Sequence, residues 1–409
     1  FSTFGLRLSY GKFGKLYNTD RYSQGPAYVV DASWPSDPHI GSYVGIATAT
    51  RPYTQGWVGY GIGWQYSNKA NVGIDLGFFK NRLLASFDLY NTDDKNLLLP
   101  IPVPEELGYS SAYQNGMSVN NKGIDVSISG KILENEKSLN WTTTLNFNVN
   151  KNKLTALPGG LTSLIIGNRK LEVGKSIDAF WLYQNNGIYN TISDIPVNSK
   201  TGLRESFNGV MLNAGDPKWK DVNGDYDINS QDKVLMGHYL PVLTGGFGNN
   251  FNYRKFSLNF QFYFALGQKL LNQQIANHFD FVNNDNSTNL SSVKEITFWE
   301  KTFNPSDYPI YNPWSSVVPY QSDQNLFLQN ASYVKLRAVS FGYDFSGANN
   351  GFFSKKRFKS ILLYISATNV FTISPFKNGD PELVDYLGNY TGYNQGIPKT
   401  YTVGIKLGI

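Results

Sequence analysis

The sequence contains many short stretches in which apolar and polar residues alternate one by one. In residues 4–11 (FGLRLSYG) every even position is apolar or aromatic. Successive side chains of a β-strand point to opposite faces, so this period predicts strands with one apolar face. Similar alternation recurs at 71–78, 83–90, 124–129, 141–149, 247–253, 256–267, 333–345, 361–371 and 401–409. The sequence therefore predicts an all-β chain.

The connections between these segments alternate in length. Short turns lie near residues 79–82, 131–138, 254–255 and 346–357, and long segments at 14–70, 91–121, 150–244, 267–332 and 372–400. Outer-membrane barrels have short periplasmic turns and long extracellular loops. We therefore expect a transmembrane antiparallel up-and-down β-barrel of about 10–12 strands, the upper count applying if residues 150–244 contain another hairpin. The final strand is expected to end at the periplasmic rim.

Near Ala338 the apolar residues change from even-numbered to odd-numbered positions. This change predicts a β-bulge, or a strand end outside the apolar band. The alternative to a barrel is a soluble β-sandwich or propeller, in which alternation also occurs. Loops of roughly 30 to 95 residues are unusual in compact soluble domains. A polar face rich in Gly, Ser, Asn and Thr also suits a water-filled or plugged lumen. Both features favour the barrel.

Composition excludes several other classes of protein. No run reaches the roughly 18 apolar residues that a transmembrane helix needs. The chain has no cysteine, which excludes disulfides and thiolate metal sites, and 15% of its residues are aromatic. A net charge of +5 over 409 residues is too dispersed to indicate nucleic-acid binding. The chain has neither an initiating Met nor a signal peptide, so we expect that residues upstream of Phe1 are missing.

One acidic segment has the spacing of a calcium-binding loop. Oxygen-bearing side chains occupy positions 1, 3, 5, 7, 9 and 12 of an EF-hand-like loop, namely Asp221, Asn223, Asp225, Asp227, Asn229 and Asp232. Position 6 is Tyr226 where a sharp turn prefers Gly, and position 12 is Asp where Glu is usual. The segment is either a Ca²⁺ site that stabilises a loop or a solvated acidic turn.

Nothing in the sequence indicates catalysis. The three histidines, His39, His238 and His278, have no metal-ligand spacing, and no Gly-x-Ser-x-Gly elbow is present. We therefore expect that the protein is not an enzyme. Five aromatic residues in expected outer loops are candidates for contact with a sugar or a partner, or for packing within loops and interfacial girdles: Trp34, Trp57, Trp299, Trp314 and Tyr320.

Several segments, taken in order, resemble the SusC/RagA group of TonB-dependent transporters. They are residues 63–99 (GWQYSNKANVGIDLGFFKNRLLASFDLYNTDDKNLLL), 120–131 (NNKGIDVSISGK), 215–241 (GDPKWKDVNGDYDINSQDKVLMGHYLP), 331–345 (ASYVKLRAVSFGYDF), 367–382 (ATNVFTISPFKNGDPE) and 396–409 (GIPKTYTVGIKLGI). Each segment alone is a weak match to the group, but six matches in the same sequence order are a specific signal. The chain departs from this group in ending on Ile409, where such barrels typically end on an aromatic residue.

The resemblance implies that residues 1–409 are the C-terminal part of one barrel domain of about 22 strands. The plug domain, the N-terminal strands and the segment that contacts the TonB complex would then lie outside this sequence. It also implies a bacterial outer-membrane location, in contact with the lipid bilayer and lipopolysaccharide.

The function implied is TonB-dependent import of an oligomeric nutrient, glycan or peptide, with a SusD-like surface lipoprotein. Two alternatives are a structural scaffold subunit of a larger outer-membrane assembly without transport, and a passive porin. The six segments that resemble the SusC/RagA group in the same order disfavour the porin.

Overall fold

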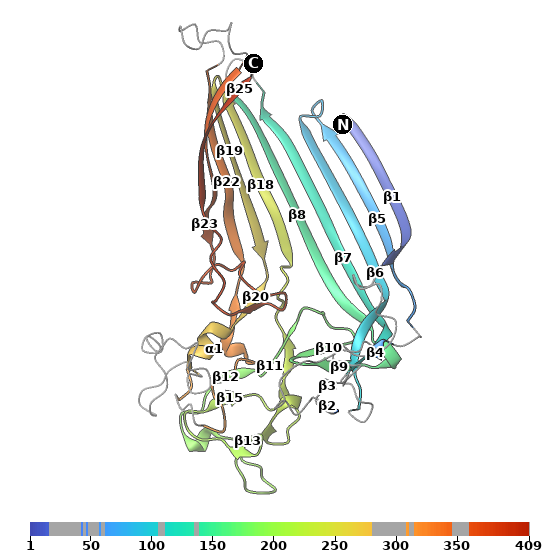
Figure 1. Cartoon of the computed structure of the whole chain (residues 1–409), viewed down its shortest axis with the longest axis vertical. Helices are drawn as coiled ribbons and strands as arrows, with labels where there is room; N and C mark the ends of the chain where they lie inside the picture. Colours follow the sequence, from blue (N-terminus) through green and yellow to red (C-terminus); the bar gives the residue numbers. More distant parts are fainter. Residues whose placement is uncertain are drawn as a thin grey trace. The chain divides into compact units, whose positions relative to one another are not determined.

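Ten long strands dominate the computed structural model of the chain (Figure 1). The structure describes residues 1–15, 62–104, 111–134, 139–279, 308–310, 315–345 and 360–408, together with the short strands β2 (Ser42–Tyr43), β3 (Ile46–Ala47) and β4 (Trp57–Val58). The long strands are β1 (Thr3–Lys15), β5 (Gln65–Phe78), β6 (Leu83–Pro102), β7 (Ser111–Leu133), β8 (Leu139–Ala156), β18 (Leu243–Tyr253), β19 (Phe256–Leu266), β22 (Tyr333–Asp344), β23 (Ser360–Ile373) and β25 (Thr400–Gly408).

The chain divides into two compact units, and strands β7 and β8 run through both. Unit 1 contains residues 1–126 and 148–177, with the strand order β1-β5-β6-β7-β8. Unit 2 contains residues 127–147 and 178–409, with the order β7-β8-β18-β19-β22-β23-β25. Antiparallel pairing joins β1 to β5, β5 to β6, β18 to β19, β19 to β22, β22 to β23 and β23 to β25. The predicted all-β, antiparallel architecture is confirmed.

All ten predicted strands are present, but one predicted loop is wrong. Residues 91–121 are mostly strand, because β6 continues to Pro102 and β7 begins at Ser111. The apolar alternation that we used to find strands stops before these strands end. Residues 91–96 (NTDDKN) are polar on both faces and residues 97–101 (LLLPI) are apolar on both faces, with Leu98 buried, so period two is lost while hydrogen bonding continues.

The further hairpin considered for residues 150–244 is not part of the large sheet. Apart from the end of β8 and the start of β18, this segment forms small separate sheets from the short strands β9 (Ser163–Ile166), β10 (Arg169–Glu172), β11 (Phe180–Leu182), β12 (Asn185–Ile188), β13 (Ser206–Phe207), β14 (Val210–Met211), β15 (Pro217–Trp219), β16 (Asp227–Ile228) and β17 (Val234–Met236). Among the described residues the large sheet therefore contains the ten predicted strands, and the two-residue strand β4, which pairs with β7, is its eleventh.

Other short elements complete the connections. They are strands β20 (Lys269–Asn272), β21 (Leu328–Asn330) and β24 (Asn389–Tyr390), helix α1 (Gln273–Phe279), and the 3₁₀ turns Pro158–Gly160, Ile192–Asp194, Ser230–Asp232 and Asn325–Phe327. In unit 2 the labelled short elements lie at the end of the strands opposite the C-terminus (Figure 1). Among the described residues, no helix is long and apolar enough to cross a membrane.

The strand register separates an apolar face from a polar face. Across β18, β19 and β22 one row consists of Phe251, Leu258 and Phe341, and the next consists of Asn250, Asn259 and Ser340. We call the face with the first row the outer face and the other the inner face. Large outer-face side chains such as Val403 and Ile405 of β25 are more than half exposed. An exposed apolar face of this extent requires an apolar environment.

The β-bulge predicted near Ala338 is confirmed, and Arg337 is its extra residue. Gln261 of β19 pairs with Ala338, whereas Phe262 pairs with Leu336, so Arg337 has no partner in this register. Beyond this point the residues of β22 that face outward are one position further along the chain, which is why the apolar pattern of the sequence changes there.

The assignment of the two faces can be tested on β23 with one pair of substitutions. Ile365 lies in an outer row with Phe341 and Val403, and Ser366 in the adjacent inner row. We expect Ile365→Arg to destabilise the barrel by about 2–4 kcal/mol, because the charge would enter lipid. Ser366→Arg should cost far less, because the inner face is polar. Urea unfolding of the full-length protein in bilayers measures both variants, and equal losses would contradict the assignment.

Candidate functional site

The inner face of unit 1 carries a compact charge cluster on β1, β5 and β6. Arg7 Nε donates to Asp75 at 2.7 Å, and its Nη2 donates to Asp88 at 2.8 Å. Ser86 Oγ accepts from Arg7 and donates to Asp75. Gly73 leaves the space for this arrangement, because an added Cβ would lie 2.4 Å from an Asp88 oxygen. The cluster cross-links three strands through side chains as well as backbone.

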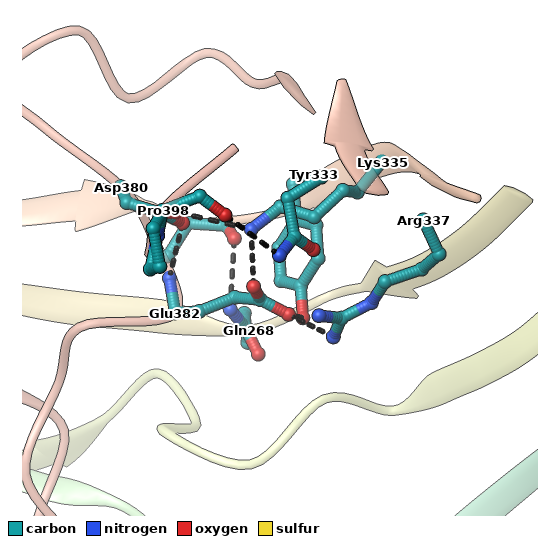
Figure 2. Close-up of polar contacts among 9 residues, drawn as sticks. Gln268, Tyr333, Lys335, Arg337, Asp380, Glu382 and Pro398 are labelled. Carbon is teal, nitrogen blue, oxygen red and sulfur yellow. Dashed lines mark hydrogen bonds and ion pairs between the residues drawn. The ribbon is translucent and has the colours of Figure 1, made fainter. Parts of the chain in front are cut away.

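A second cluster lies on unit 2, where strand β22 meets the segment after β23 (Figure 2). Lys335 Nζ donates to Asp380 at 3.0 Å and also to Glu382. The same Glu382 carboxylate accepts from Tyr333 Oη at 2.6 Å and from Arg337. Lys335 is only 1% exposed. One carboxylate therefore joins three side chains of one strand.

This cluster is electrically balanced, since two cations face two carboxylates. A buried ammonium is costly unless it is paired and hydrogen-bonded, and Lys335 satisfies that requirement with two carboxylates. Arg337 is the bulge residue, and its guanidinium lies 5.1 Å from the ring centroid of Tyr263. The bulge thus adds a second cation beside Lys335, on the same side of the strand.

The segment that supplies the two carboxylates, which we call the strap (residues 374–390), is also held at its far end. Strand β24 of the strap pairs in parallel with β20, and Leu271 N donates to Gly388 O at 2.9 Å. Phe376 and Tyr390 pack with Leu270 and Ala331 in a small buried cluster. Charge pairs and an apolar core therefore fix the strap to the ends of β19 and β22.

The long segment between β8 and β18 has its own core, and Gln324 lies within it. Its Oε1 accepts from Trp219 Nε1 at 2.9 Å and from Asn185 at 3.1 Å. Its Nε2 donates to the carbonyls of Pro319 and Gln321. The side chain is fully buried with all four hydrogen-bonding positions used, which is the condition for stable burial of an amide. It connects segments more than a hundred residues apart.

A second buried polar pair lies in the same core. Tyr189 Oη donates to Glu205 at 2.6 Å, and Glu205 is 3% exposed. Burial raises the pKa of the Glu205 carboxyl above its ordinary value, while the bond from Tyr189 opposes that shift. Burial and the neighbouring carboxylate together raise the pKa of the Tyr189 phenol. The pair connects the residue before β13 to the residue after β12.

The predicted calcium-binding segment forms a tight loop whose carboxylates accept hydrogen bonds from backbone N–H groups. Asp221 accepts from Gly224 and Tyr226, and Asp232 accepts from Val222, Asn223 and Asn229. Asn223, Asp225, Asp227 and Asn229 each accept a further bond from a nearby backbone N–H. Within the described residues no group of three or more acidic or histidine side chains is arranged to hold a metal. The Ca²⁺ site stays a prediction.

The backbone at Tyr226 nevertheless makes the turn that an EF-hand-like loop needs. Its φ of 68° is in the left-handed region, which normally selects Gly, and Gly224 has a φ of 78°. A non-glycine residue in this region costs roughly 1–2 kcal/mol. The bonds to the Asp221 carboxylate hold the strained residue in place.

Four of the five aromatic candidates lie outside the residues whose side chains the structure describes. Trp34, Trp299 and Trp314 lie outside the described residues, and Trp57 belongs to β4, whose side chains are not described. Tyr320 is 7% exposed and donates to the carbonyl of Pro309. Its ring packs in the core with Phe180, Leu182, Leu271, Ala276 and Phe327. This position gives Tyr320 a packing role, and contact with a ligand stays a prediction for all five.

The histidines form no catalytic constellation in the described part of the chain. His238 Nδ1 lies 3.3 Å from Asp178, while His39 is not described and His278 lies on α1 with an undescribed side chain.

Comparison with known proteins shows a similarity to TonB-dependent receptors. Residues 2–178 match the family model described as "TonB dependent receptor-like, beta-barrel". This match covers a little under half of the chain. The TonB-dependent receptor P3 of Formosa agariphila is 29% identical over 355 residues, which are 84% of this chain and 33% of that protein. The TonB-dependent receptor SusC of Bacteroides thetaiotaomicron is 25% identical over 394 residues, which are 92% of this chain and 35% of SusC.

The structure of the RagAB peptide transporter has the same fold, with a TM-score of 0.72 and 21% identity, covering 99% of this chain and 40% of that one. The predicted resemblance to the SusC/RagA group is confirmed, as is the outer-membrane location of the barrel. The chain spans about a third of the length of the receptors P3 and SusC.

Sequence reasoning missed the Lys335 cluster, although both of its halves lie in segments that carry the resemblance. Residues 331–345 contain Tyr333, Lys335 and Arg337, and residues 367–382 contain Asp380 and Glu382. The available signal was three polar side chains at alternate positions in the first half of β22. Their partners lie 45 or more residues away, so the sequence did not show the pairing.

The contribution of the cluster can be measured by removing its buried cation. Lys335→Ala leaves the carboxylates of Asp380 and Glu382 partly unpaired, so we expect the strap to be destabilised by about 3–5 kcal/mol. Lys377→Ala is the matched control, because Lys377 is an exposed lysine of the same strap. Hydrogen exchange of residues 374–390 in the full-length receptor should increase in the first variant only. Unchanged protection in Lys335→Ala would show that the apolar contacts suffice.

Proposed function

We propose that this chain forms the C-terminal part of the barrel of a TonB-dependent importer that takes up an oligomeric nutrient, a glycan or a peptide. The polar inner face of an outer-membrane strand array, in a chain related to TonB-dependent receptors, carries the proposal. Such a face provides a hydrated path for a hydrophilic solute. The proposal assigns no catalytic step to the chain, and its relatives P3 and SusC are named as TonB-dependent receptors.

We further propose that a SusD-like surface lipoprotein covers the long loops and that the TonB complex acts on a part of the protein outside this sequence. The loops support such a partner, because those described in unit 2 have buried cores of their own. An ordered surface loses less conformational entropy on association than a flexible one.

The acidic loop of residues 221–232 is proposed to bind Ca²⁺ as a structural ion. Its support is the spacing of oxygen ligands and the left-handed backbone at Tyr226. Hard cations of this kind are bound by carboxylate and carbonyl oxygens, and the bound ion would relieve repulsion between four aspartates.

The import proposal is tested in cells that produce the full-length receptor. Uptake of the nutrient should stop when TonB is deleted or the proton gradient is dissipated, whereas surface binding should remain. Purification in mild detergent should recover one surface lipoprotein with the receptor. Uptake that persists without TonB would indicate a passive pore. A multi-protein assembly without uptake would indicate the scaffold role.

The calcium proposal predicts that Ca²⁺ protects residues 221–232 of the receptor from proteolysis. Asp225→Ala should abolish this protection, because Asp225 is an exposed ligand candidate whose partners among the described residues are the N–H of Asp227 and the side-chain amide of Asn223. Glu134→Ala, which removes a carboxylate from the end of β7, should leave the protection intact. Tb³⁺ luminescence excited through tyrosine gives a direct binding measurement. Equal protection with Ca²⁺ and with a chelator would contradict the proposal.

A further inference from the structure

Positive charge is concentrated in the short turns between the long strands. The segments that contain these turns, 79–82, 131–138, 254–255 and 346–357, together carry nine basic residues and two acidic ones. The whole chain has a net charge of only +5, so the remainder has a slight excess of acidic residues. Short turns form the periplasmic ends of the hairpins in an outer-membrane barrel. The sequence is therefore most basic where the strands meet the periplasmic leaflet.

The turn between β18 and β19 shows how two of these cations are placed. Arg254 and Lys255 form its tip and are exposed, and Arg254 has a φ of 54°, in the left-handed region. The Arg254 guanidinium lies 5.4 Å from the ring centroid of Tyr253, which is within the range of a cation–π contact. Tyr253 belongs to the outer face, because it lies two residues beyond Phe251 in the same strand. This contact places the guanidinium beside the surface that faces lipid.

Aromatic side chains form the outer face next to this turn. Tyr253 of β18 pairs with Phe256 of β19, which in turn pairs with Tyr343 of β22. The ring centroids of Phe256 and Tyr343 are 4.8 Å apart in an edge contact, and Tyr253 and Phe256 are 45% and 44% exposed. Aromatic rings with a polar tip are typical of the level at which lipid headgroups meet the acyl chains. The two cations therefore lie at the level of the headgroup phosphates.

This surface does not depend on parts of the protein outside the sequence. Strands β18, β19 and β22 each have a neighbouring strand of the large sheet on both sides. Their outer face is the one directed away from the lumen, which is the space that a plug fills. Neither further strands nor a plug would cover these rings and cations.

Neither cation is neutralised within the described part of the chain. Arg254 and Lys255 form no ion pair there with another described residue. Asp344 N donates to Lys255 O at 2.8 Å, but Asp344 follows Tyr343 in β22 and so belongs to the inner face. A phosphate group would accept charge-assisted hydrogen bonds from both cations, and a guanidinium matches its geometry. A zwitterionic headgroup would add an ammonium group that the two cations repel.

We propose that the β18–β19 turn binds an anionic phospholipid of the periplasmic leaflet. Arg254 and Lys255 hold the phosphate, and an acyl chain lies against Tyr253 and Phe256. Anionic lipid surfaces attract Lys and Arg residues close to the membrane, and each such residue adds to the binding. The occupant is a lipid because the cations lie beside rings on the lipid-facing surface. The proposal goes beyond import, since it requires only that the barrel lies in the outer membrane.

The test removes both charges and compares the loss with a matched pair of substitutions. Arg254→Asn combined with Lys255→Gln preserves the turn, because Asn tolerates the left-handed region. Arg204→Asn combined with Lys200→Gln removes the same charges from the segment between β8 and β18. Both variants of the full-length receptor are purified in a neutral detergent and checked for heat-modifiable migration. Lys255→Gln alone replaces the first pair if that variant does not fold.

Lipid binding is measured by native mass spectrometry with dioleoylphosphatidylglycerol and dioleoylphosphatidylcholine, and with glycerol 3-phosphate as a competitor. The phosphatidylglycerol should bind more tightly than the phosphatidylcholine, and added salt should weaken its binding, because exposed charges are screened. Removing Arg254 and Lys255 should lower its affinity roughly 30-fold, about fivefold for each cation, whereas the matched pair should not lower it. Glycerol 3-phosphate should not compete at equal concentration, because it has no acyl chains.

Four results would overturn the lipid site. The two lipids bind equally well, a correctly folded variant of the turn binds phosphatidylglycerol unchanged, or the matched pair lowers binding as much as the turn variant does. The fourth is displacement of the lipid by an equal concentration of glycerol 3-phosphate, which would indicate a site for free anions. TonB-dependent uptake is measured separately, so the import function can stand when the lipid site fails.

Discussion

Backbone hydrogen bonding in a medium without water is the constraint on which the rest of this structure depends. Lipid offers no partner to a peptide N–H or C=O, so a spanning strand must pair along its whole length. Strands β1 and β5 pair in unbroken register from Thr3 with Gly77 to Lys15 with Gln65. Once the backbone is fixed in this way, side chains must alternate between two faces. The apolar outer rows and polar inner rows follow from that single requirement.

The constraint ends where the strands leave the apolar layer, and packing takes over there. Loops that project into water can form small sheets, turns and helices, but each must bury enough surface to become ordered. In unit 2 this is achieved with aromatic clusters around Tyr183 and Phe180 and with saturated polar groups such as Gln324. The Lys335 cluster stands at the boundary, where a charge pair attaches a loop to a strand. Its charges are tolerable because each cation has a carboxylate within hydrogen-bond distance.

How much of this could be predicted from the sequence depends on the range of the interactions. Period two is a local signal, so all ten strands were predicted, and the parity change at Ala338 located the bulge. The extension of β6 to Pro102 was missed because residues 91–96 are polar on both faces and residues 97–101 are apolar on both faces, so neither stretch alternates. The loop sheets and the strap were missed for a different reason. Gln324 contacts Asn185 and Trp219, and Lys335 contacts Asp380, across separations that local patterns do not report.

The cations that β22 presents on the inner face of unit 2 are compensated by the strap. Lys335 and Arg337 face Asp380 and Glu382, whereas the row of Asn250, Asn259 and Ser340 is uncharged. A buried cation that lost its carboxylates would be strongly destabilising. The strand and the strap therefore depend on one another, because β22 positions the two cations and the strap makes the burial of Lys335 possible.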